Sequence, residues 1–236
     1  MNKKNISSNF IPLLILGILL IAVILTQTNL IDSGKGYFFK DKEESLAQVT
    51  ALKVTLGDSE ADMRATITGY VQAEGAGPFE GLVVLAHARY LGTGLEAVSN
   101  AILDAQGSYT QRQRIEIPGY YELWATYGNV KSNVVKLKIY GVVVDLPTQH
   151  KRSDIWMTMK LYADRAGDYD IYVAPNGDWS LEWKFFTLKV NEGGYAEQRI
   201  WYRPNVGVYW WDARFKTDSR YSAISWGASD FVEVIP

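Results

Sequence analysis

The feature that most constrains the fold is a short pattern that occurs twice. Residues 119–127 read GYYELWATY and residues 207–215 read GVYWWDARF. Side chains at alternate positions of a β-strand lie on one face, so each copy predicts a strand with one apolar face. The paired positions are Tyr121 with Tyr209, Leu123 with Trp211, Ala125 with Ala213 and Tyr127 with Phe215. We interpret the chain as a tandem duplication with a boundary near Gly141.

Short segments that alternate apolar and polar residues, separated by turn residues, follow one another along most of the chain. The first set is expected at Val49–Leu56, Met63–Ala73, Leu82–Leu91, Ala97–Leu103, Ser108–Ile117, Tyr120–Tyr127 and Asn133–Tyr140. The second set is expected at Val142–Leu146, Ile155–Ala163, Tyr169–Ala174, Trp179–Val190, Tyr195–Tyr202, Val208–Lys216 and Phe231–Ile235. Seven short strands are typical of an immunoglobulin-like sandwich. The sequence therefore predicts an all-β fold of two tandem immunoglobulin-like β-sandwiches, residues 48–141 and 142–236.

The turn and core residues of the first copy carry a family resemblance. DAQGSY begins at Asp104, and PGYYELWATYGNVKSNVVKLKI runs from Pro118 to Ile139. This pattern resembles the C-terminal half of prokaryotic Ig-like and fibronectin-III-like surface domains. The second copy departs from it with a longer loop at residues 203–206 and an insertion around residues 217–226. The resemblance implies a fold and a cell-surface setting rather than an activity.

An uncharged apolar run, Phe10–Thr26, follows Lys3 and Lys4. As a helix it would be about 25 Å long, close to the thickness of a hydrocarbon core. We predict a cytoplasmic N-terminus (residues 1–9), a transmembrane signal-anchor (10–27) and a stalk (28–47), with the C-terminal domains extracytoplasmic. The membrane is thus a predicted partner in a single-pass protein. A cleaved signal peptide and a processed pilin-type leader are the alternatives, although no A-x-A site follows the run.

Composition excludes several kinds of chemistry. The chain has no cysteine, which removes disulfides, thiolate nucleophiles and cysteine-ligated metals. Its net charge of -2 does not suggest a nucleic-acid binder. No nucleophile motif accompanies His87, expected in a strand, or His150, expected in the linker. We predict no catalysis and no cofactor, and the weak metal candidates are the turn carboxylates Asp164, Asp168 and Asp170.

Alternation along the predicted strands sorts the tryptophans of the second copy. It turns Trp156 and Trp201 outward on one sheet, and Tyr172 and Trp210 outward on the other. We predict these two aromatic patches as candidate binding surfaces, because large exposed aromatics often anchor a partner. The alternative is that they are covered by the insertion, by the first domain or by the stalk.

The same alternation assigns the remaining tryptophans. Trp179, Trp183 and Trp211 are expected in the core of the second sandwich, and Trp124 is expected to point outward from the first. A large aromatic core suits a domain that has no cysteine to crosslink it.

These patterns favour a membrane-anchored cell-surface protein that presents two Ig-like domains for adhesion, scaffolding or envelope structure, without catalysis. One alternative is a module that binds surface polysaccharide through Trp156, Trp201 or Trp210. Another is a homo-oligomeric filament, in which Gly36–Val49 adds as a strand to a neighbour's open sheet. The predicted partner of the second domain is therefore either a protein or a surface polysaccharide.

Overall fold

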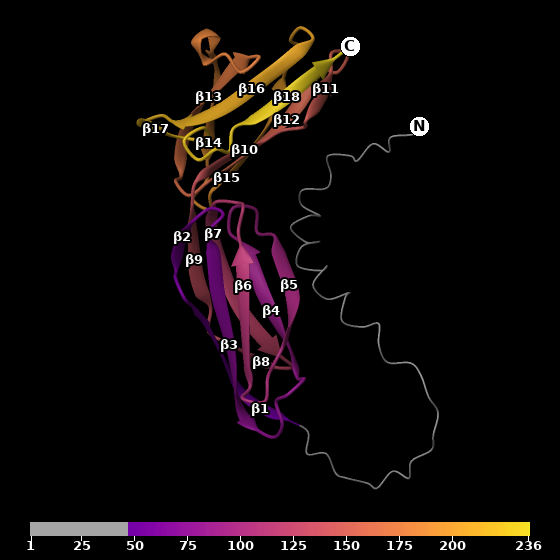
Figure 1. The fold of residues 1–236 in the computed structure, drawn as a ribbon, viewed down its shortest axis with the longest axis vertical. Coiled ribbons are helices and arrows are strands. Elements are labelled where there is room, and N and C mark those ends of the chain that lie inside the picture. Colours follow the sequence, from indigo (N-terminus) through magenta and orange to yellow (C-terminus); the bar gives the residue numbers. More distant parts are fainter. Residues whose placement is uncertain (1–46) are drawn as a thin grey trace, which may run out of the picture.

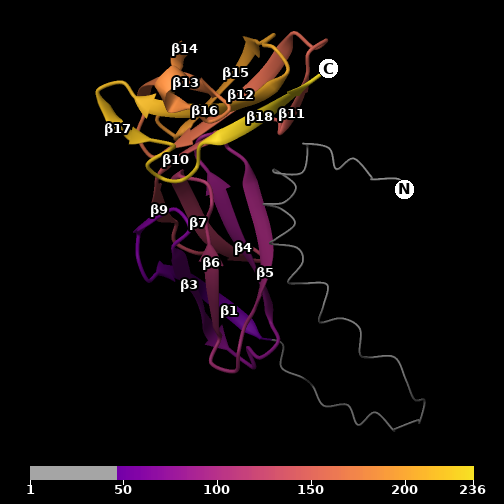
Figure 2. The same ribbon diagram turned by 45° about the horizontal axis from the view of Figure 1, so that its top comes forward.

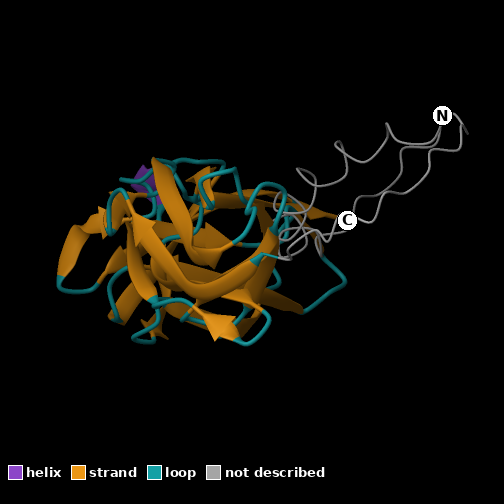
Figure 3. Cartoon of the chain, turned by 90° about the horizontal axis from the view of Figure 1, so that it is seen from below, coloured by secondary structure: helices purple, strands orange, loops and turns teal. Residues whose placement is uncertain are grey.

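The computed structural model describes residues 47–236, which form two β-sandwiches placed end to end (Figure 1). Strands make up nearly all of the regular structure of these residues, which also contain one short 3₁₀ helix (Figure 3). The all-β prediction is confirmed. The predicted N-terminus, the transmembrane segment 10–27 and all but the last residue of the predicted stalk lie outside the described residues. Within residues 47–236, no helix is both long enough and apolar enough to span a bilayer.

The first sandwich, which we call domain 1, has two sheets. Its strands are β1 (Gln48–Leu56), β2 (Glu60–Asp62), β3 (Thr66–Ala76), β4 (Val83–Tyr90), β5 (Glu96–Ile102), β6 (Ser108–Arg114), β7 (Gly119–Tyr127), β8 (Val130–Lys131) and β9 (Val135–Tyr140). One sheet has the order β1-β3-β6, and the other has the order β2-β9-β7-β4-β5, with β8 paired to β7. Tyr121, near the start of β7, donates its hydroxyl to the Ile117 carbonyl at 2.8 Å, a tyrosine corner typical of immunoglobulin-like sandwiches.

The second sandwich, domain 2, repeats this topology. Its strands are β10 (Val142–Asp145), β11 (Gln149–Lys151), β12 (Trp156–Ala163), β13 (Gly167–Pro175), β14 (Trp183–Val190), β15 (Tyr195–Trp201), β16 (Gly207–Phe215), β17 (Asp218–Ser222) and β18 (Asp230–Ile235). The sheet orders are β10-β12-β15 and β11-β18-β16-β13-β14, with β17 paired to β16. Even the parallel pairing of β2 with β9 recurs, as β11 with β18. The two sandwiches are therefore copies of one arrangement, and β7 and β16, which carry the repeated pattern, hold equivalent places in it.

Three parts of the predicted strand map are wrong. Residues 179–181 form the 3₁₀ helix η1 (Trp179–Leu181), because the Asp178 side chain caps it, and β14 begins only at Trp183. The expected strand 63–73 starts only at Thr66, because residues 63–65 lie in the turn between β2 and β3, in which Arg64 has φ 70. The short strands β2, β8, β11 and β17 were not predicted, since strands of two to five residues are too short for alternation to reveal them. His150 therefore lies in β11 and not in a linker.

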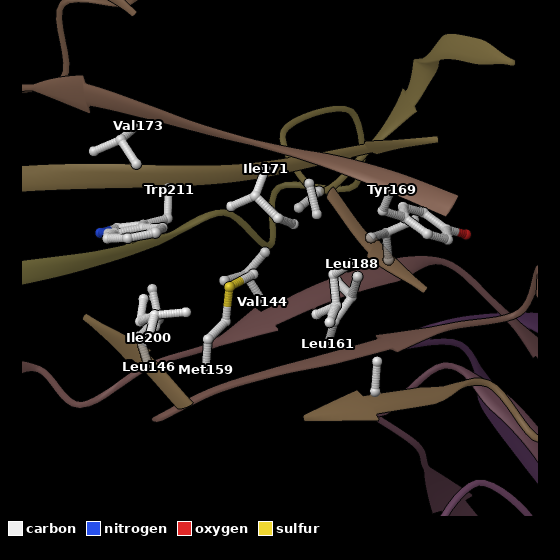
Figure 4. Packing of buried hydrophobic residues seen from close by; sticks show 14 of the residues in the cluster. Val144, Leu146, Met159, Leu161, Tyr169, Ile171, Val173, Leu188, Ile200 and Trp211 are labelled. Carbon is white, nitrogen blue, oxygen red and sulfur yellow. The ribbon is translucent and has the colours of Figure 1, made fainter. Parts of the chain in front are cut away.

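The core of each sandwich lies between its two sheets. In domain 2, Trp211 from β16 lies across from Met159 of β12 and Ile200 of β15 (Figure 4), and its ring packs edge-on against Tyr202 at 5.0 Å. In domain 1, smaller residues of β1 and β3 face β4, β5 and β7. There the Asn133 amide also joins the layers, accepting from the Val54 amide and donating to its carbonyl, both at 2.9 Å.

Tyrosines form the centre of the junction between the two domains. The Tyr90 hydroxyl of domain 1 donates to the Gly194 carbonyl of domain 2 at 2.7 Å. The Tyr90 ring lies 5.1 Å from the ring of Tyr121 and 6.0 Å from that of Tyr162, which in turn contacts Tyr195. Burial raises the pKa of Tyr90 and of Tyr121. Burial, with nearby carboxylates, raises the pKa of Tyr162 to about 12.

Close backbone approach adds to the tyrosine contact. A Cβ on Gly193 would lie 2.5 Å from the Leu91 carbonyl oxygen, so only glycine fits this position. The neighbouring Asn191 side chain donates to the Gly92 carbonyl at 3.1 Å. The turn between β14 and β15 is thus fitted against the turn between β4 and β5, which fixes how the two domains meet.

The predicted insertion around residues 217–226 also belongs to the junction. The loop after β17 brings Trp226 and Ala228 against an apolar cluster of domain 1, which includes Met63, Ile67 and Ile139. At the same place, the Arg64 guanidinium donates to the Gly227 carbonyl at 3.2 Å. The insertion therefore packs against domain 1 and helps to hold the two domains together.

A buried carboxylate completes the junction. Asp164, between β12 and β13, has almost no exposed surface. One of its oxygens accepts from the Gly141 amide at 3.0 Å, and the other lies 3.4 Å from the Lys138 ammonium of domain 1. The Tyr120 hydroxyl of domain 1 donates to the Asp164 backbone carbonyl at 2.8 Å. This residue of domain 2 is therefore held by Lys138 and Tyr120 of domain 1 and by the linker peptide.

Replacing Asp164 with alanine should destabilise the protein by about 2 kcal/mol or more, because the buried Gly141 amide loses an ionised acceptor. The matched control is Asp168→Ala, whose loose surface pair with Lys216 should contribute about 0–1 kcal/mol. Chemical denaturation followed by circular dichroism measures both. Equal losses of unfolding free energy in the two variants would contradict the assignment.

The tyrosine junction also predicts a dependence on alkaline pH. The pKa of a tyrosine in the unfolded chain is about 10, whereas the pKa of Tyr162 in the folded chain is raised to about 12. The stability from its neutral form is complete below about pH 10 and is lost as the pH rises through about 12. The thermal midpoint should therefore fall above about pH 10, and fall less in Tyr162→Phe, which has no proton to lose. Melting curves across this range that are equally steep for both chains would contradict this.

Candidate functional site

The exposed aromatic pair Trp156 and Trp201 lies at the end of domain 2 that faces away from domain 1. The two residues are directly opposite each other on the antiparallel strands β12 and β15. They are 46% and 64% exposed, among the most open large apolar side chains of residues 47–236. Because β12 runs from Trp156 to the junction at Ala163, the pair lies roughly 23 Å from domain 1. We call this surface the tryptophan tip.

Two arginines give the tryptophan tip a positive charge. The Arg199 guanidinium, at the next outward position of β15, lies 4.9 Å from the centre of the Trp156 ring. Arg203, just beyond Trp201, is also exposed. Neither arginine forms an ion pair with any described residue. The tip therefore offers flat apolar rings next to guanidinium groups that are free to meet an acceptor.

The duplication allows the tip to be compared with its counterpart in domain 1. Strand β3 aligns with β12 when their buried positions are matched. The residue pairs between β3 and β6 then correspond one by one to those between β12 and β15. Thr68 opposite Arg112 matches Thr158 opposite Arg199, and Thr66 opposite Arg114 matches Trp156 opposite Trp201. The Thr–Arg pair is the same in both copies, whereas the tryptophans are special to domain 2. Core packing does not require aromatics at this position, since domain 1 folds without them.

The second predicted patch is not an open surface. Tyr172 and Trp210 do lie on the other sheet, as expected, but both are half-buried. The Arg214 guanidinium lies 4.1 Å over the Tyr172 ring and is itself held by Glu182 and Asp212. Trp210 packs against Phe231 at 5.3 Å. Their own domain covers these rings, so they offer little to a ligand.

The alternative that the patches are covered by the insertion or by domain 1 does not hold for Trp156 and Trp201. The insertion is at the opposite end of domain 2, against domain 1. The stalk, the third proposed cover, lies outside the described residues apart from Ala47.

Several tryptophans lie elsewhere than predicted. Trp211 is in the core, as expected, but Trp179 is only partly buried and Trp183 is exposed. The 3₁₀ turn and an extra residue, Phe185, shift their alternation out of register with the core. Trp124 does lie on the outer face of its sheet, yet it is buried, because His87 stacks on it at 5.0 Å and Lys131 lies 5.0 Å from its centre.

The predicted metal candidates do not come together. Each carboxylate has a cation of its own: Asp164 has Lys138, Asp168 has Lys216 and Asp170 has Lys184. No group of three potential metal ligands exists within residues 47–236. The histidines are likewise engaged in structure. His150 is buried with its Nε2 3.0 Å from the Tyr202 carbonyl, and His87 Nδ1 lies 2.8 Å from Glu96.

Comparisons with known proteins give matches among solved structures alone. No family model and no curated protein sequence matches the chain. The chain is similar to the Yersinia pseudotuberculosis adhesin InvE at 12% identity and a TM-score of 0.35, covering 80% of this chain and 60% of that one. It is similar to the D0–D1 domain of intimin at 16% identity and a TM-score of 0.29, covering 79% and 94%.

Native Escherichia coli alpha-2-macroglobulin is a third structure that matches, at 11% identity and a TM-score of 0.36. The match covers 79% of this chain and 17% of that one. The chain thus spans less than a fifth of the length of the macroglobulin.

The difference in burial between Trp211 and the pair Trp156–Trp201 predicts very different losses of stability when they are replaced. Trp211→Ala should destabilise the protein by about 3–5 kcal/mol, since it opens a cavity in the core. The double change Trp156→Ala and Trp201→Ala should alter the unfolding free energy by no more than about 0.5 kcal/mol for each site, the range of exposed positions. Urea titrations measure both. A large loss in the double variant would mean that the tip is a structural element.

Proposed function

We propose that this chain is a cell-surface protein of the adhesion type, anchored in a membrane through Phe10–Thr26 with its N-terminus in the cytoplasm, which contacts its partner through the tryptophan tip. The observation that carries the proposal is the pair Trp156–Trp201, exposed and opposite each other at the end of domain 2 that faces away from domain 1. Large aromatics at an interface are the residues that most often supply its binding energy. No catalytic role is part of the proposal.

The junction supports the role of an arm. A flexible linker would let domain 2 turn freely, whereas here hydrogen bonds, an ion pair and an apolar cluster join the two domains. A rigid connection lowers the conformational entropy lost when the tip engages a partner. The tip is then presented about a domain's length farther from the anchor than a single sandwich would reach.

A second candidate, recognition of surface polysaccharide, has a specific observation in its favour. Trp156 and Trp201 present flat apolar faces, and Arg199 and Arg203 beside them have no carboxylate partner in the described part of the chain. Such a surface suits an acidic saccharide, whose ring faces pack on indole and whose carboxylates accept from guanidinium.

The test is retention of the full-length chain, in detergent, on an array of immobilised neutral and acidic polysaccharides and on intact cells. The change is Trp156→Ala together with Trp201→Ala, and the matched control is Thr66→Ala, at the equivalent position of domain 1. We expect the double variant to lose binding by a factor of ten or more, equivalent to about 1.4 kcal/mol, and the control to bind normally.

The pattern of binding separates the two candidates. Loss on acidic polysaccharides supports the saccharide function, whereas loss on cells alone supports a protein partner. Full retention of both kinds of binding by the folded double variant would overturn the role of the tip.

A further inference from the structure

Strand β5 of domain 1 is an open sheet edge without the usual protection. Among the strands of residues 47–236 it pairs with β4 alone, with no shift in register over Glu96–Ile102. Its sequence, EAVSNAI, has no lysine, no proline and a single charge at its first residue. Natural proteins normally guard such edges with lysine, proline or a bulge, because an unpaired edge accepts another strand.

The equivalent edge in domain 2 is guarded. Strand β14 holds the same place in its sheet as β5. It carries outward lysines at Lys184 and Lys189, and a bulge at Phe185 interrupts its register with β13. Lys184 is fixed by Asp170 at 2.7 Å. Two copies of one topology thus differ in whether this edge can accept a strand.

The open backbone groups of β5 lie at its outward residues. At one end of the β4–β5 ladder the Leu103 amide donates to the Leu82 carbonyl at 2.9 Å. Hydrogen-bonded and non-hydrogen-bonded residue pairs alternate along an antiparallel ladder. The backbone N–H and C=O groups of the odd-numbered residues of β5 therefore bond to β4, and those of the even-numbered residues point to the open edge. The side chains of the same residues, Val98, Asn100 and Ile102, point away from the core.

These outward side chains extend an apolar surface. Val98 and Ile102 are 45% and 56% exposed, and Val83 and Leu85 beside them on β4 are similarly open. The inward residues of β5, Ala97, Ser99 and Ala101, are small. In Figures 1 and 2 this edge forms the outer side of the lower sandwich. The edge can therefore be approached by another strand.

We propose that two copies of this chain pair through β5, edge to edge and antiparallel, so that the two five-stranded paths become one continuous sheet. A two-fold contact needs a surface that is complementary to itself. With the axis at Asn100, Val98 of one copy faces Ile102 of the other, and Asn100 faces Asn100. The pairing spans residues 98–102 and leaves the acidic Glu96 and Asp104 outside it.

The competing register is less favourable. An axis at Ser99 would set Glu96 against Ile102 and Val98 against Asn100, which opposes polar to apolar side chains at each outward pair. The Asn100 register instead places apolar side chains opposite each other, as stable cross-strand pairs require.

The proposed pairing has a consequence for the adhesion function. The strands of domain 1 run along the long axis of the molecule (Figure 1), so an antiparallel β5 pair points the two arms in opposite directions. Copies paired in this way would be presented from opposing surfaces. This consequence rests on the proposed function, whereas the pairing itself does not.

The absence of cysteine makes the pairing directly testable. In full-length chains in detergent, Asn100→Cys should crosslink to itself under mild oxidation, because opposed Cα atoms in this register lie about 5.5 Å apart, within disulfide reach. The matched control is Thr187→Cys on the guarded edge β14. We expect about tenfold more linked dimer for Asn100→Cys, since only that pair is held in disulfide geometry. Equal yields from the two variants would overturn the proposal.

A second variant gives β5 outward lysines like those of β14. Val98→Lys with Ile102→Lys puts like charges along the edge and should abolish crosslinking through Asn100→Cys while the circular dichroism spectrum is retained. Persistent crosslinking in this folded variant would contradict pairing through β5. Loss of crosslinking on deletion of residues 34–46 would also overturn it, because the two β5 edges would then not associate by themselves.

Vesicles separate this inference from the proposed function. Full-length chain reconstituted in phosphatidylcholine vesicles should cluster them, and the Val98→Lys, Ile102→Lys variant should not. Clustering that the lysine variant retains would contradict β5 as the bridging contact. Crosslinking without clustering would keep the β5 pair and overturn the bridging of surfaces, and loss of polysaccharide binding by the tip variants is unaffected by either result.

Discussion

A carboxylate that folding removes from water must be given partners, and at the junction between the two domains that requirement falls on Asp164. Its partners come from the linker peptide at Gly141 and from Lys138 at the end of domain 1. Both partners lie at the C-terminal end of domain 1, whereas Asp164 belongs to domain 2. The orientation of one sandwich on the other is therefore tied to a group that cannot be left unpaired, and the tyrosine cluster and the insertion pack around that fixed point.

The duplication shows which residues serve the fold and which are specific to one copy. Both domains keep the same strand order and the same Thr–Arg pair on the outer face. Two of their differences are the tryptophan tip of domain 2 and the unguarded edge of domain 1. Since each difference is absent from a copy that folds with the same topology, neither is needed for folding.

Much of the fold could be predicted from the sequence, because alternation reports which side of a strand faces the core. It found Trp211 inside and Trp156 and Trp201 outside. It failed at Trp179 and Trp183, where a capped turn and a bulge break the two-residue period, and at Trp124, where neighbouring polar side chains cover an outward ring. The β5 edge was also missed, since whether a strand has a free side depends on sheet order, which a local pattern does not contain.

Gly141, the residue between β9 and β10, acquires a mechanical meaning from its bonds. Any pull between the start of β1 and the end of β18 runs through this peptide. Its amide donates to the Asp164 carboxylate, and its carbonyl accepts from the Asp164 amide and from the Tyr221 hydroxyl. Tension is therefore shared between the covalent chain and a set of transverse hydrogen bonds at the junction. The chain has no cysteine and therefore no disulfide, so the force that the junction withstands depends on how fast those hydrogen bonds open. The junction should therefore resist a fast pull more strongly than a slow one.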